Sequence, residues 1–401
     1  MNDVYRGRLG DLVSIKHGFA FPGSGFSDNS ALPMLLTPGN FALGGGFQGG
    51  KTRSFAGDFD SAYVLSPGDL VVSMTDLSRE GATLGNLALV PSEGIYLHNQ
   101  RIGLVSILRT DLATKEFLNY RLRLPDYRTH ILGTATGSTV RHTSPDRIKA
   151  FPLVLPPIER QRAIAEVLGA LDDKIAANGR LAGLAFDLAR ESFRQQTANL
   201  PGVSLTAFAE PLLGGTPNRA EATLWRDEVA WASARDVSAA SHGIIVKTME
   251  RISGVASAGA NRLAAHPRGS VVLTARGTVG AVARLAIPAA INQSCYAFEP
   301  TKVRAAPLYF SVLAAVDRLQ AMAHGSVFST VTMDTLERVE VADARLLPPD
   351  VVAKLEALSG VNEGAALENQ TLAELRDTLL PELMSGRLRV REAERAVEEV
   401  L

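Results

Sequence analysis

One sequence pattern occurs twice in this chain, with a period of about 190 residues. This duplication constrains the fold strongly, because each copy must form the same kind of folded unit. Residues 65–73 and 265–273 both carry a proline followed by a β-branched run, which predicts a turn that enters a buried strand. Gly85 and Gly280 come next, and each begins a second predicted strand. The order of predicted elements is therefore the same in both copies.

Two further matches extend the repeat. The pairs Asn99-Gln100 and Asn292-Gln293 both stand at the entry to a third predicted strand. A block then aligns without a gap, reading GSTVRHTSPDRI from Gly137 and GSVFSTVTMDTL from Gly325. Together these matches indicate two copies of one globular unit.

A double proline ends each copy and opens a long helical pattern. Pro156-Pro157 precedes the first pattern, which should begin at about Ile158 and end in the mid-190s, and Pro348-Pro349 precedes the second. Proline is tolerated there because the first amide of a helix has no intrahelical partner. Some 35 helical residues span roughly 50 Å, more than a small domain covers, so we expect the two helices to pair with each other. The apolar residues predicted to form the helix–helix and subunit interface are Ile164, Leu168, Leu171, Ile175, Leu181, Leu355, Leu358, Leu372, Leu375 and Leu379.

Polar residues interrupt both apolar stripes. Asn178 lies in the first stripe, and Asn362 and Asn369 lie in or near the second. A polar residue in such a seam costs stability but can fix the register and the choice of partner. The alternative is that each helix packs only on its own globular unit.

These patterns predict an α+β protein. Two pseudo-repeated globular units, mixed or rich in β-structure, would be joined by two long helices that form an antiparallel coiled coil. The predicted divisions are 1–155 for the first globular unit, 156–199 for the first long helix, 200–347 for the second globular unit, 348–390 for the second long helix and 391–401 for a C-terminal tail.

Composition excludes several classes of protein. Cys295 is the only cysteine, so the chain can form neither an intrachain disulfide nor a site built from several thiolates. No apolar run approaches the roughly 18 to 20 residues of a membrane span, and the N-terminus has no signal-peptide pattern, so we expect a cytoplasmic protein. The net charge is −1, but basic residues gather in segments 121–149 and 247–284, which is compatible with a nucleic-acid partner.

Motifs for catalysis are not recognisable. Neither a glycine-rich cofactor loop after a strand nor an Asn/Asp-Pro-Pro-aromatic tetrad is convincing, so the chain does not look like a methyltransferase. The glycine cluster 44–52 predicts a flexible surface loop, with contact between Lys51 and a DNA backbone as the alternative. The seven histidines show no metal-ligand spacing, and Asp172-Asp173 is interpreted as solvated helix surface. We therefore predict a binding protein with no catalytic residue, no metal and no cofactor of its own.

Both helix regions carry longer motifs. FPLVLPPIERQRAIAEVLGALDDKIAANGRL begins at Phe151, and ENQTLAELRDTLLPELMSGRLRV begins at Glu368. These stretches resemble the central and distal conserved regions of the specificity subunits of type I restriction-modification systems. With the duplicated blocks, the resemblance spans nearly the whole chain. One departure is that the second helix start lacks the glutamine that the first keeps at Gln161.

The resemblance implies a division of labour. Each globular unit would be a target-recognition domain that reads one half of an asymmetric, bipartite sequence in double-stranded DNA, and the helices would set the spacer. The helices would also bind two modification methyltransferase subunits, and restriction and motor subunits would complete the complex. S-adenosylmethionine, ATP and Mg would belong to those partner subunits, and no membrane would be involved.

Sequence-specific binding requires side chains at base edges, whereas phosphate contacts only position a protein. The repeated Asn-Gln pairs could supply amides for base reading, but capping of a turn is the favoured interpretation. The predicted DNA-contacting residues are Gly137, Ser138, Thr139, Arg141, His142 and Thr143 in the first copy and Arg276, Thr278, Ser326 and Ser329 in the second.

Alternative functions stay open at this point. A specificity subunit that serves methylation only has the same sequence features as one that serves restriction. A coiled-coil protein-interaction scaffold without DNA readout is the main alternative, although it gives no reason for two divergent globular halves on one frame. An enzyme with an unrecognised active site should carry, in one half, a dense polar cluster that the other half lacks, and the sequence contains no such cluster.

Overall fold

The computed structural model describes residues 4–49, 53–259, 261–324 and 330–400 of the chain. Contacts divide the chain into two compact units. The first unit comprises Met1–Asp172 and Leu375–Leu401, and the second comprises Asp173–Glu374. Both long helices therefore contribute one segment to each unit.

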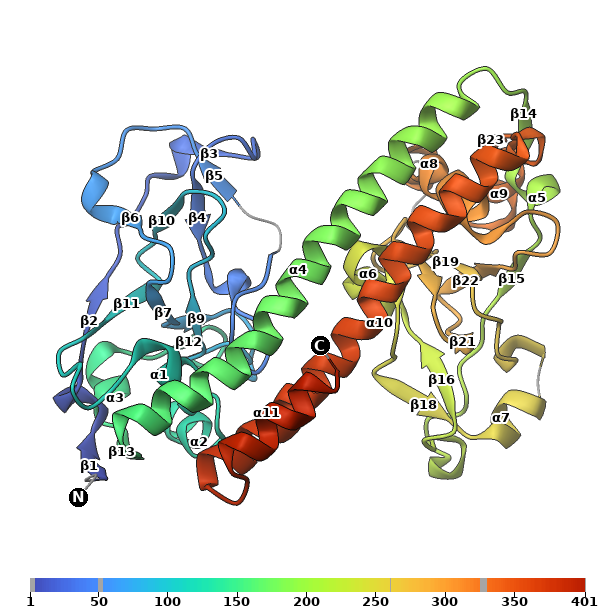
Figure 1. Cartoon of the computed structure of the whole chain (residues 1–401). Helices are drawn as coiled ribbons and strands as arrows, with labels where there is room; N and C mark the ends of the chain where they lie inside the picture. The colour runs from blue at the N-terminus through green and yellow to red at the C-terminus, as the bar shows by residue number, and fades with distance from the viewer. Residues whose placement is uncertain (1–3, 50–52, 260, 325–329, 401) are drawn as a thin grey trace. The chain divides into compact units, whose positions relative to one another are not determined.

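The first unit combines small sheets with short helices (Figure 1). One sheet has the strand order β2-β11-β7-β9 and another β3-β5-β4-β10-β6, with the pairs β1-β13 and β12-β8 beside them. The strands are β1 (Tyr5–Arg8), β2 (Val13–His17), β3 (Phe26–Ser27), β4 (Met34–Leu36), β5 (Arg53–Phe55), β6 (Val64–Leu65), β7 (Leu70–Ser73), β8 (Thr75–Asp76), β9 (Leu87–Leu89), β10 (Tyr96–His98), β11 (Ile102–Ile107), β12 (Arg141–His142) and β13 (Pro152–Leu155). The short helices are α1 (Lys115–Arg121), α2 (Pro125–Thr134), α3 (Pro145–Lys149) and α11 (Val390–Glu398).

The two larger sheets of the first unit share one core. Leu36 and Tyr96 from the five-stranded sheet pack with Val71, Ala88 and Ile102 from the four-stranded sheet. Burial of such β-branched and aromatic side chains between two sheets is the main contribution to the stability of a unit of this kind.

The second unit has the same plan. A sheet of order β15-β22-β19-β20-β17 lies with a sheet of order β18-β16-β21 and the pair β14-β23. The strands are β14 (Gly202–Ser204), β15 (Pro211–Leu213), β16 (Val229–Ala232), β17 (Ile244–Ile245), β18 (Glu250–Ile252), β19 (Val271–Thr274), β20 (Val282–Leu285), β21 (Ala289–Ile291), β22 (Cys295–Phe298) and β23 (Glu340–Ala342). The short helices are α5 (Leu205–Phe208), α6 (Ala234–Ala239), α7 (Gly254–Gly259), α8 (Ala305–His324) and α9 (Met333–Arg338).

Two cores of the second unit cover the two faces of its central sheet. One joins its sheets through small and β-branched side chains such as Ala232, Val272 and Ile291. The other covers the opposite face of the central sheet, where Val271 and Phe298 pack with apolar side chains of α8. Because both faces of β19 are buried, its sequence is a continuous apolar run instead of an alternating one.

Strand pairing confirms the duplication for the central strands of both units. The order β2-β11-β7-β9 recurs as β15-β22-β19-β20, and the parallel pair β4-β10 recurs as β16-β21. One detail of the sequence alignment was wrong by one residue. Gly68 and Gly269 hold the same turn with φ of 75° and 88°, so residues 65–73 correspond to 266–274. Both copies need a glycine with positive φ before the strand. The sequence alignment instead matched the two prolines, which are not at equivalent positions.

The two long helices are α4 (Ile158–Thr197) and α10 (Pro349–Ser385). In the second unit they run antiparallel, because Lys174 forms an ion pair with Glu368 at 3.2 Å, while Phe193 shares a core cluster with Leu355. Asn369 donates a 3.1 Å hydrogen bond to the carbonyl of Ile175. A polar side chain of one helix thus bonds to the backbone of the other, as expected for a residue that fixes register.

The predicted interface residues of the long helices lie mostly inside their units. Ile164, Leu168, Leu171, Leu355, Leu372 and Leu379 are buried, and Ile175, Leu358 and Leu375 are half-buried. Leu181 is 52% exposed and so lies outside the buried seam, and its place at a subunit interface stays a prediction. In this part of α4 the inward positions are taken by Ala182, Ala185 and Ala189. The apolar spacing alone could not show that small residues would occupy the buried face.

Candidate nucleic-acid interface

Three segments meet at the end of the central strand in each unit. In the first unit the Met74 amide donates to the Arg101 carbonyl at 2.9 Å, and the Met74 carbonyl accepts from the Thr143 amide at 3.0 Å. In the second unit Ala275 makes the same two hydrogen bonds, to the Ser294 carbonyl at 2.7 Å and from the Val331 amide at 3.0 Å. One backbone position therefore holds the Asn-Gln turn, the loop after the central strand and the middle of the duplicated block together.

The loop after the central strand differs between the units. The Gly85 amide donates to the Ser73 carbonyl, and the Gly280 amide donates to the Thr274 carbonyl. These hydrogen bonds close the loop, which comprises residues 75–84 in the first unit and 276–279 in the second. Both glycines have positive φ, and an added Cβ would meet Ile131 at 2.8 Å in the first unit and Gln320 in the second. The units thus share a frame and differ in the loop that it carries.

Asp76 organises the longer loop. Its carboxylate accepts hydrogen bonds from the Ser78 amide at 2.6 Å and from both the amide and the hydroxyl of Thr83. Burial by itself raises the pKa of Asp76, but these hydrogen bonds outweigh burial and hold the pKa below its ordinary value. Arg128 on α2 donates to the Leu84 carbonyl at 2.6 Å and to the Gly81 carbonyl. The loop is therefore rigidly held while it exposes Leu77 and Arg79.

The predicted DNA-contacting residues of the first copy lie beside this loop. Gly137, Ser138 and Thr139 form an exposed tip in which Gly137 has a φ of 90°. The Arg141 side chain is partly exposed and donates to the carbonyl of Arg79 at 3.1 Å.

His142 and Thr143 complete this predicted set. His142 is exposed, with Nδ1 lying 3.2 Å from the hydroxyl of Thr75. Thr143 is only 8% exposed, so its side chain faces the interior and does not fit a base contact. The period-two geometry of the strand that enters α3 explains why Thr143 and His142 point to opposite sides.

In the second unit the structure describes half of the predicted set. Arg276 and Thr278 are exposed on the short loop, and the Thr278 carbonyl accepts from the Thr274 hydroxyl. Gln320 on α8 donates to the Val279 carbonyl at 2.9 Å, as Arg128 does to the longer loop. Ser326 and Ser329 lie outside the described residues.

Asn99 and Asn292 cap equivalent turns. The side-chain oxygen of Asn99 accepts from the Arg101 amide at 3.1 Å, and that of Asn292 accepts from the Ser294 amide at 3.0 Å. This is the hydrogen bond of an Asx turn, which agrees with the favoured interpretation of the repeated asparagine.

Sequence reasoning missed a glycine in each unit, Gly18 and Gly214, whose backbone packs closely against the Asn-Gln turn. An added Cβ at Gly18 would lie 2.3 Å from the carbonyl oxygens of His98 and Asn99, and one at Gly214 would lie as close to that of Ile291. Their shared position after the first strand of each sheet is the sequence signal that could have revealed them.

The glycine cluster near residue 45 has a structural role. Gly45 and Gly46 have positive φ, and a Cβ at Gly45 would lie 2.8 Å from the Arg123 side chain. The cluster therefore lies close against Arg123, and its described part is not a free loop. Lys51, the residue considered for DNA contact, lies outside the described residues.

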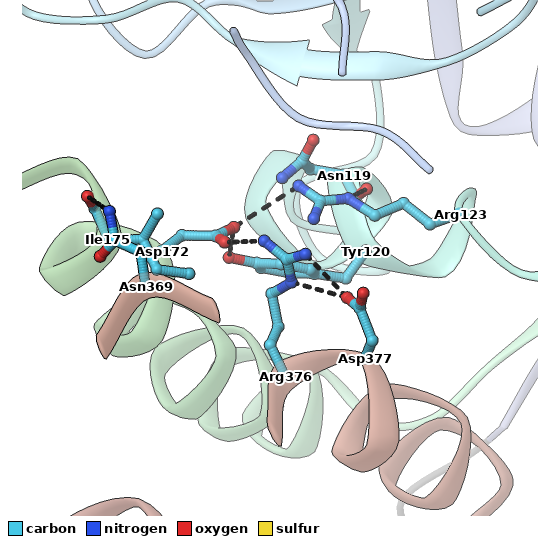
Figure 2. A network of polar contacts seen from close by, with 8 residues as sticks. All are labelled: Asn119, Tyr120, Arg123, Asp172, Ile175, Asn369, Arg376 and Asp377. Atoms are coloured by element: carbon cyan, nitrogen blue, oxygen red, sulfur yellow. Dashed lines mark hydrogen bonds and ion pairs between the residues drawn. The ribbon is translucent and has the colours of Figure 1, made fainter. Parts of the chain in front are cut away.

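Arg123 belongs to a polar network centred on Asp172 (Figure 2). The Asp172 carboxylate accepts from the Tyr120 hydroxyl at 2.7 Å and from Arg376 at 2.6 Å, and it lies 3.6 Å from the Arg123 guanidinium. Burial and the neighbouring carboxylate raise the pKa of Tyr120, so its hydroxyl stays protonated and donates. The interpretation of Asp172 as solvated surface was wrong, because α1 and α10 of the first unit both supply donors to it.

Glu363 on α10 has the corresponding position in the second unit. Its carboxylate binds Arg268 and lies 2.9 Å from the Arg284 guanidinium, and Arg284 also donates to the Ser359 carbonyl at 2.8 Å. The side chains of Arg284 and Glu363 are nearly fully buried. In the first unit the carboxylate on α4 pairs with Arg123 of the globular part and Arg376 of α10, whereas in the second unit the carboxylate on α10 pairs with two arginines of the globular part.

Part of α4 presents an apolar surface without cover in the described chain. Leu181, Leu184 and Leu188 follow one another at helical spacing and are 52%, 70% and 52% exposed. An exposed leucine row of this kind is typical of a surface that binds another protein. We call these three residues the leucine stripe.

Two kinds of feature are absent from the described residues. No group of three or more His, Cys, Asp or Glu side chains lies in an arrangement that could hold a metal ion there. Within the same part of the chain, no helix combines the length and apolar character that crossing a membrane requires.

The fold and these surfaces define a class of binding protein in which two repeated α+β units share two long helices. The chain belongs to the family described as the type I restriction modification DNA specificity domain, whose profile matches residues 1–183 and 246–375.

Individual relatives agree with this assignment. The chain is 27% identical over 164 residues to the type I restriction enzyme EcoBI specificity subunit of Escherichia coli, a match covering 41% of this chain and 31% of that protein. The chain therefore spans about a third of the length of that curated relative. Its fold is similar to the crystal structure of the type I restriction-modification S subunit from M. genitalium, with a TM-score of 0.58, 13% identity and coverage of 95% of this chain and 96% of that one.

Proposed function

We propose that this chain is the DNA-recognition subunit of a type I restriction-modification complex and that each unit reads one half of a bipartite, asymmetric target in double-stranded DNA. The observation that carries the proposal is the shared frame with different loops, 75–84 in one unit and 276–279 in the other. A single frame can present different side chains to two different half-sites. A protein-interaction scaffold without DNA readout would not need this combination.

The contact surface in the first unit contains Leu77, Arg79, Ser138, Thr139 and Arg141. Arginine can bind guanine or phosphate, hydroxyl groups accept and donate at base edges, and an exposed leucine can contact a thymine methyl group. In the second unit the corresponding side chains are Arg276 and Thr278. Asp76 and Arg128 hold the first loop in place before DNA binds, which reduces the entropy lost on binding.

The leucine stripe is the proposed docking surface for a modification methyltransferase subunit. The helices would bind two such subunits, with restriction and motor subunits completing the complex. S-adenosylmethionine, ATP and Mg would be bound by those partners, and this chain would contribute no catalytic residue. Its place of action would be the cytoplasm, where the DNA is.

DNA binding by the chain with its modification subunit tests the proposal. We expect Arg79→Ala combined with Arg141→Ala to weaken binding to the cognate duplex by roughly tenfold or more and to reduce the salt dependence. Arg109→Ala is the matched control, because Arg109 is an exposed arginine paired with Asp111. Equal binding by the double variant and the control would contradict the proposed surface. If the unsubstituted complex does not prefer any sequence, the scaffold alternative is favoured.

A further inference from the structure

The repeated Asn-Gln pair divides into two roles. Asn99 and Asn292 use their side-chain oxygens to cap the turn, as described above. Gln100 and Gln293 are exposed at the tips of these turns, and neither side-chain amide makes a hydrogen bond within the described residues. The turn therefore accounts for the asparagines and leaves the glutamines without a structural explanation.

The backbone holds both glutamines in the same way. On one side, the Gly18 amide donates to the Ile102 carbonyl at 3.3 Å, and the Gly214 amide donates to that of Cys295 at 3.1 Å. On the other side, the turn is bonded to Met74 in the first unit and to Ala275 in the second. Each glutamine thus occupies the same position on a turn that is fixed from both sides.

Both turns also lie at the proposed contact surface. Met74 immediately precedes the loop that exposes Arg79, and its carbonyl holds the end of the segment that carries Arg141. Ala275 immediately precedes Arg276. Gln100 and Gln293 are therefore near the side chains that differ between the units.

Identity at equivalent positions has a consequence for recognition. Loops that differ can read what differs between two half-sites, whereas a side chain that is the same in both units can serve a feature that both half-sites share. Glutamine pairs with adenine in the major groove, because its amide accepts from N6 and donates to N7. A glutamine that contacted phosphate alone would bind every sequence equally, so dependence on an adenine separates the two kinds of contact.

We propose that Gln100 and Gln293 each bind one adenine, at the same place relative to its unit, in the two half-sites. The assignment rests on the proposed DNA-recognition function and adds a base contact that is common to both halves. The capped turns hold the backbone of both glutamines in place before binding, so only the two side chains need to be ordered on binding.

The test uses the full chain with its modification subunit and a cognate duplex in which each adenine is replaced in turn by 7-deazaadenine, which lacks the N7 acceptor. We expect one substitution in each half-site to weaken binding of the unsubstituted protein. Gln100→Ala should weaken binding to the normal duplex by between about fivefold and 100-fold and should be insensitive to that substitution in one half-site. Gln293→Ala should show the same behaviour for the other half-site.

Two controls separate this base contact from other effects. Gln196→Ala removes an exposed glutamine on α4 and should bind like the unsubstituted protein. Gln100→Glu keeps the shape but loses the donor to N7, so it should bind as weakly as Gln100→Ala while its thermal unfolding is unchanged. The proposal is overturned if Gln100→Ala binds normally, if its loss is the same on every sequence, or if no adenine substitution is coupled to it. Absence of sequence-specific binding by the unsubstituted complex would instead reject the proposed function itself.

Discussion

The Tyr120 hydroxyl donates a 2.7 Å hydrogen bond to the carboxylate of Asp172, which also accepts from Arg376. Helix α1 carries Tyr120, α4 carries Asp172 and α10 carries Arg376. One carboxylate thus connects the globular part of the first unit to both long helices. Arg123 completes the network with a side chain that is only 4% exposed.

Removing the carboxylate should therefore destabilise the first unit. Asp172→Ala leaves Arg123 and Arg376 without their shared partner, and breaking a buried ion pair costs about 3 to 5 kcal/mol. Tyr120→Phe removes one hydrogen bond to a charged group and should cost about 1.5 to 3 kcal/mol. Denaturant unfolding measures both values. Asp173→Ala is the matched control, because Asp173 is the exposed neighbour on the same helix. Similar values for Asp172→Ala and Asp173→Ala would show that the network does not stabilise the unit.

Asp76 makes stability depend on pH. Its pKa is lower in the folded chain than in the unfolded chain, because hydrogen bonds from Ser78 and Thr83 favour the carboxylate in spite of burial. The stabilisation is therefore present above the ordinary pKa of about 3.9 and is lost as pH falls through the lower folded value. Asp76→Asn should be less stable than the unsubstituted protein at pH 7, and the difference should shrink as pH falls below about 4. Thermal unfolding from pH 7 to pH 3 measures this difference, with Asp58→Asn on an exposed aspartate as the control. A difference that does not change with pH would reject the role of the carboxylate.

The two returning glycines should not tolerate a side chain. Gly85→Ala and Gly280→Ala each force an alanine into the left-handed region, which costs about 1 to 2 kcal/mol, and each adds a Cβ against a helix. Gly133→Ala is the contrasting variant, because Gly133 lies inside α2 with nothing within 4 Å of an added Cβ. That substitution should be neutral or stabilising by up to about 1 kcal/mol. Comparable melting temperatures for all three variants would contradict the assigned turns.

Substitution in the leucine stripe should affect assembly and leave folding intact. Replacing Leu181, Leu184 and Leu188 together by glutamine changes exposed positions only, so thermal unfolding of the chain should shift little. Co-purification with the modification subunit should be lost or strongly reduced. Leu168→Ala is the opposite case, because Leu168 is fully buried and its truncation should cost about 2 to 5 kcal/mol. Normal assembly of the triple variant would reject the stripe as a docking surface.

Much of the fold could be predicted because duplication and helical periodicity are strong signals. The order of elements, the α+β class and the long helices that begin near Ile158 and Pro349 all follow from local pattern. The sequence could not predict the environment of residues whose burial and partners are set by tertiary contacts. Leu181 has the right spacing for the apolar stripe, yet the buried face there belongs to alanines. Asp172 looks like ordinary helix surface until distant residues such as Tyr120 and Arg376 are brought to it.

The candidate site was harder to predict than the fold. Arg276 lies on an exposed loop and Arg141 is partly exposed on β12, but strand geometry turns Thr143 inward. Arg79 and Leu77 were not predicted, because only the hydrogen bonds around Asp76 show that their loop is fixed at the contact surface. Loop geometry of this kind depends on side chains far apart in sequence and has no periodic signal.

The central claim is that the two units read the two halves of one DNA target. The most direct measurement is single-molecule methylome sequencing of cells that express this chain with its modification subunit. The account predicts a bipartite adenine-methylated motif that disappears without the chain. Replacing residues 1–150 by those of a relative should change one half of the motif and leave the other half and the spacer as they were. A folded chain with an active partner and no chain-dependent motif, or a replacement that changes both halves together, would contradict it.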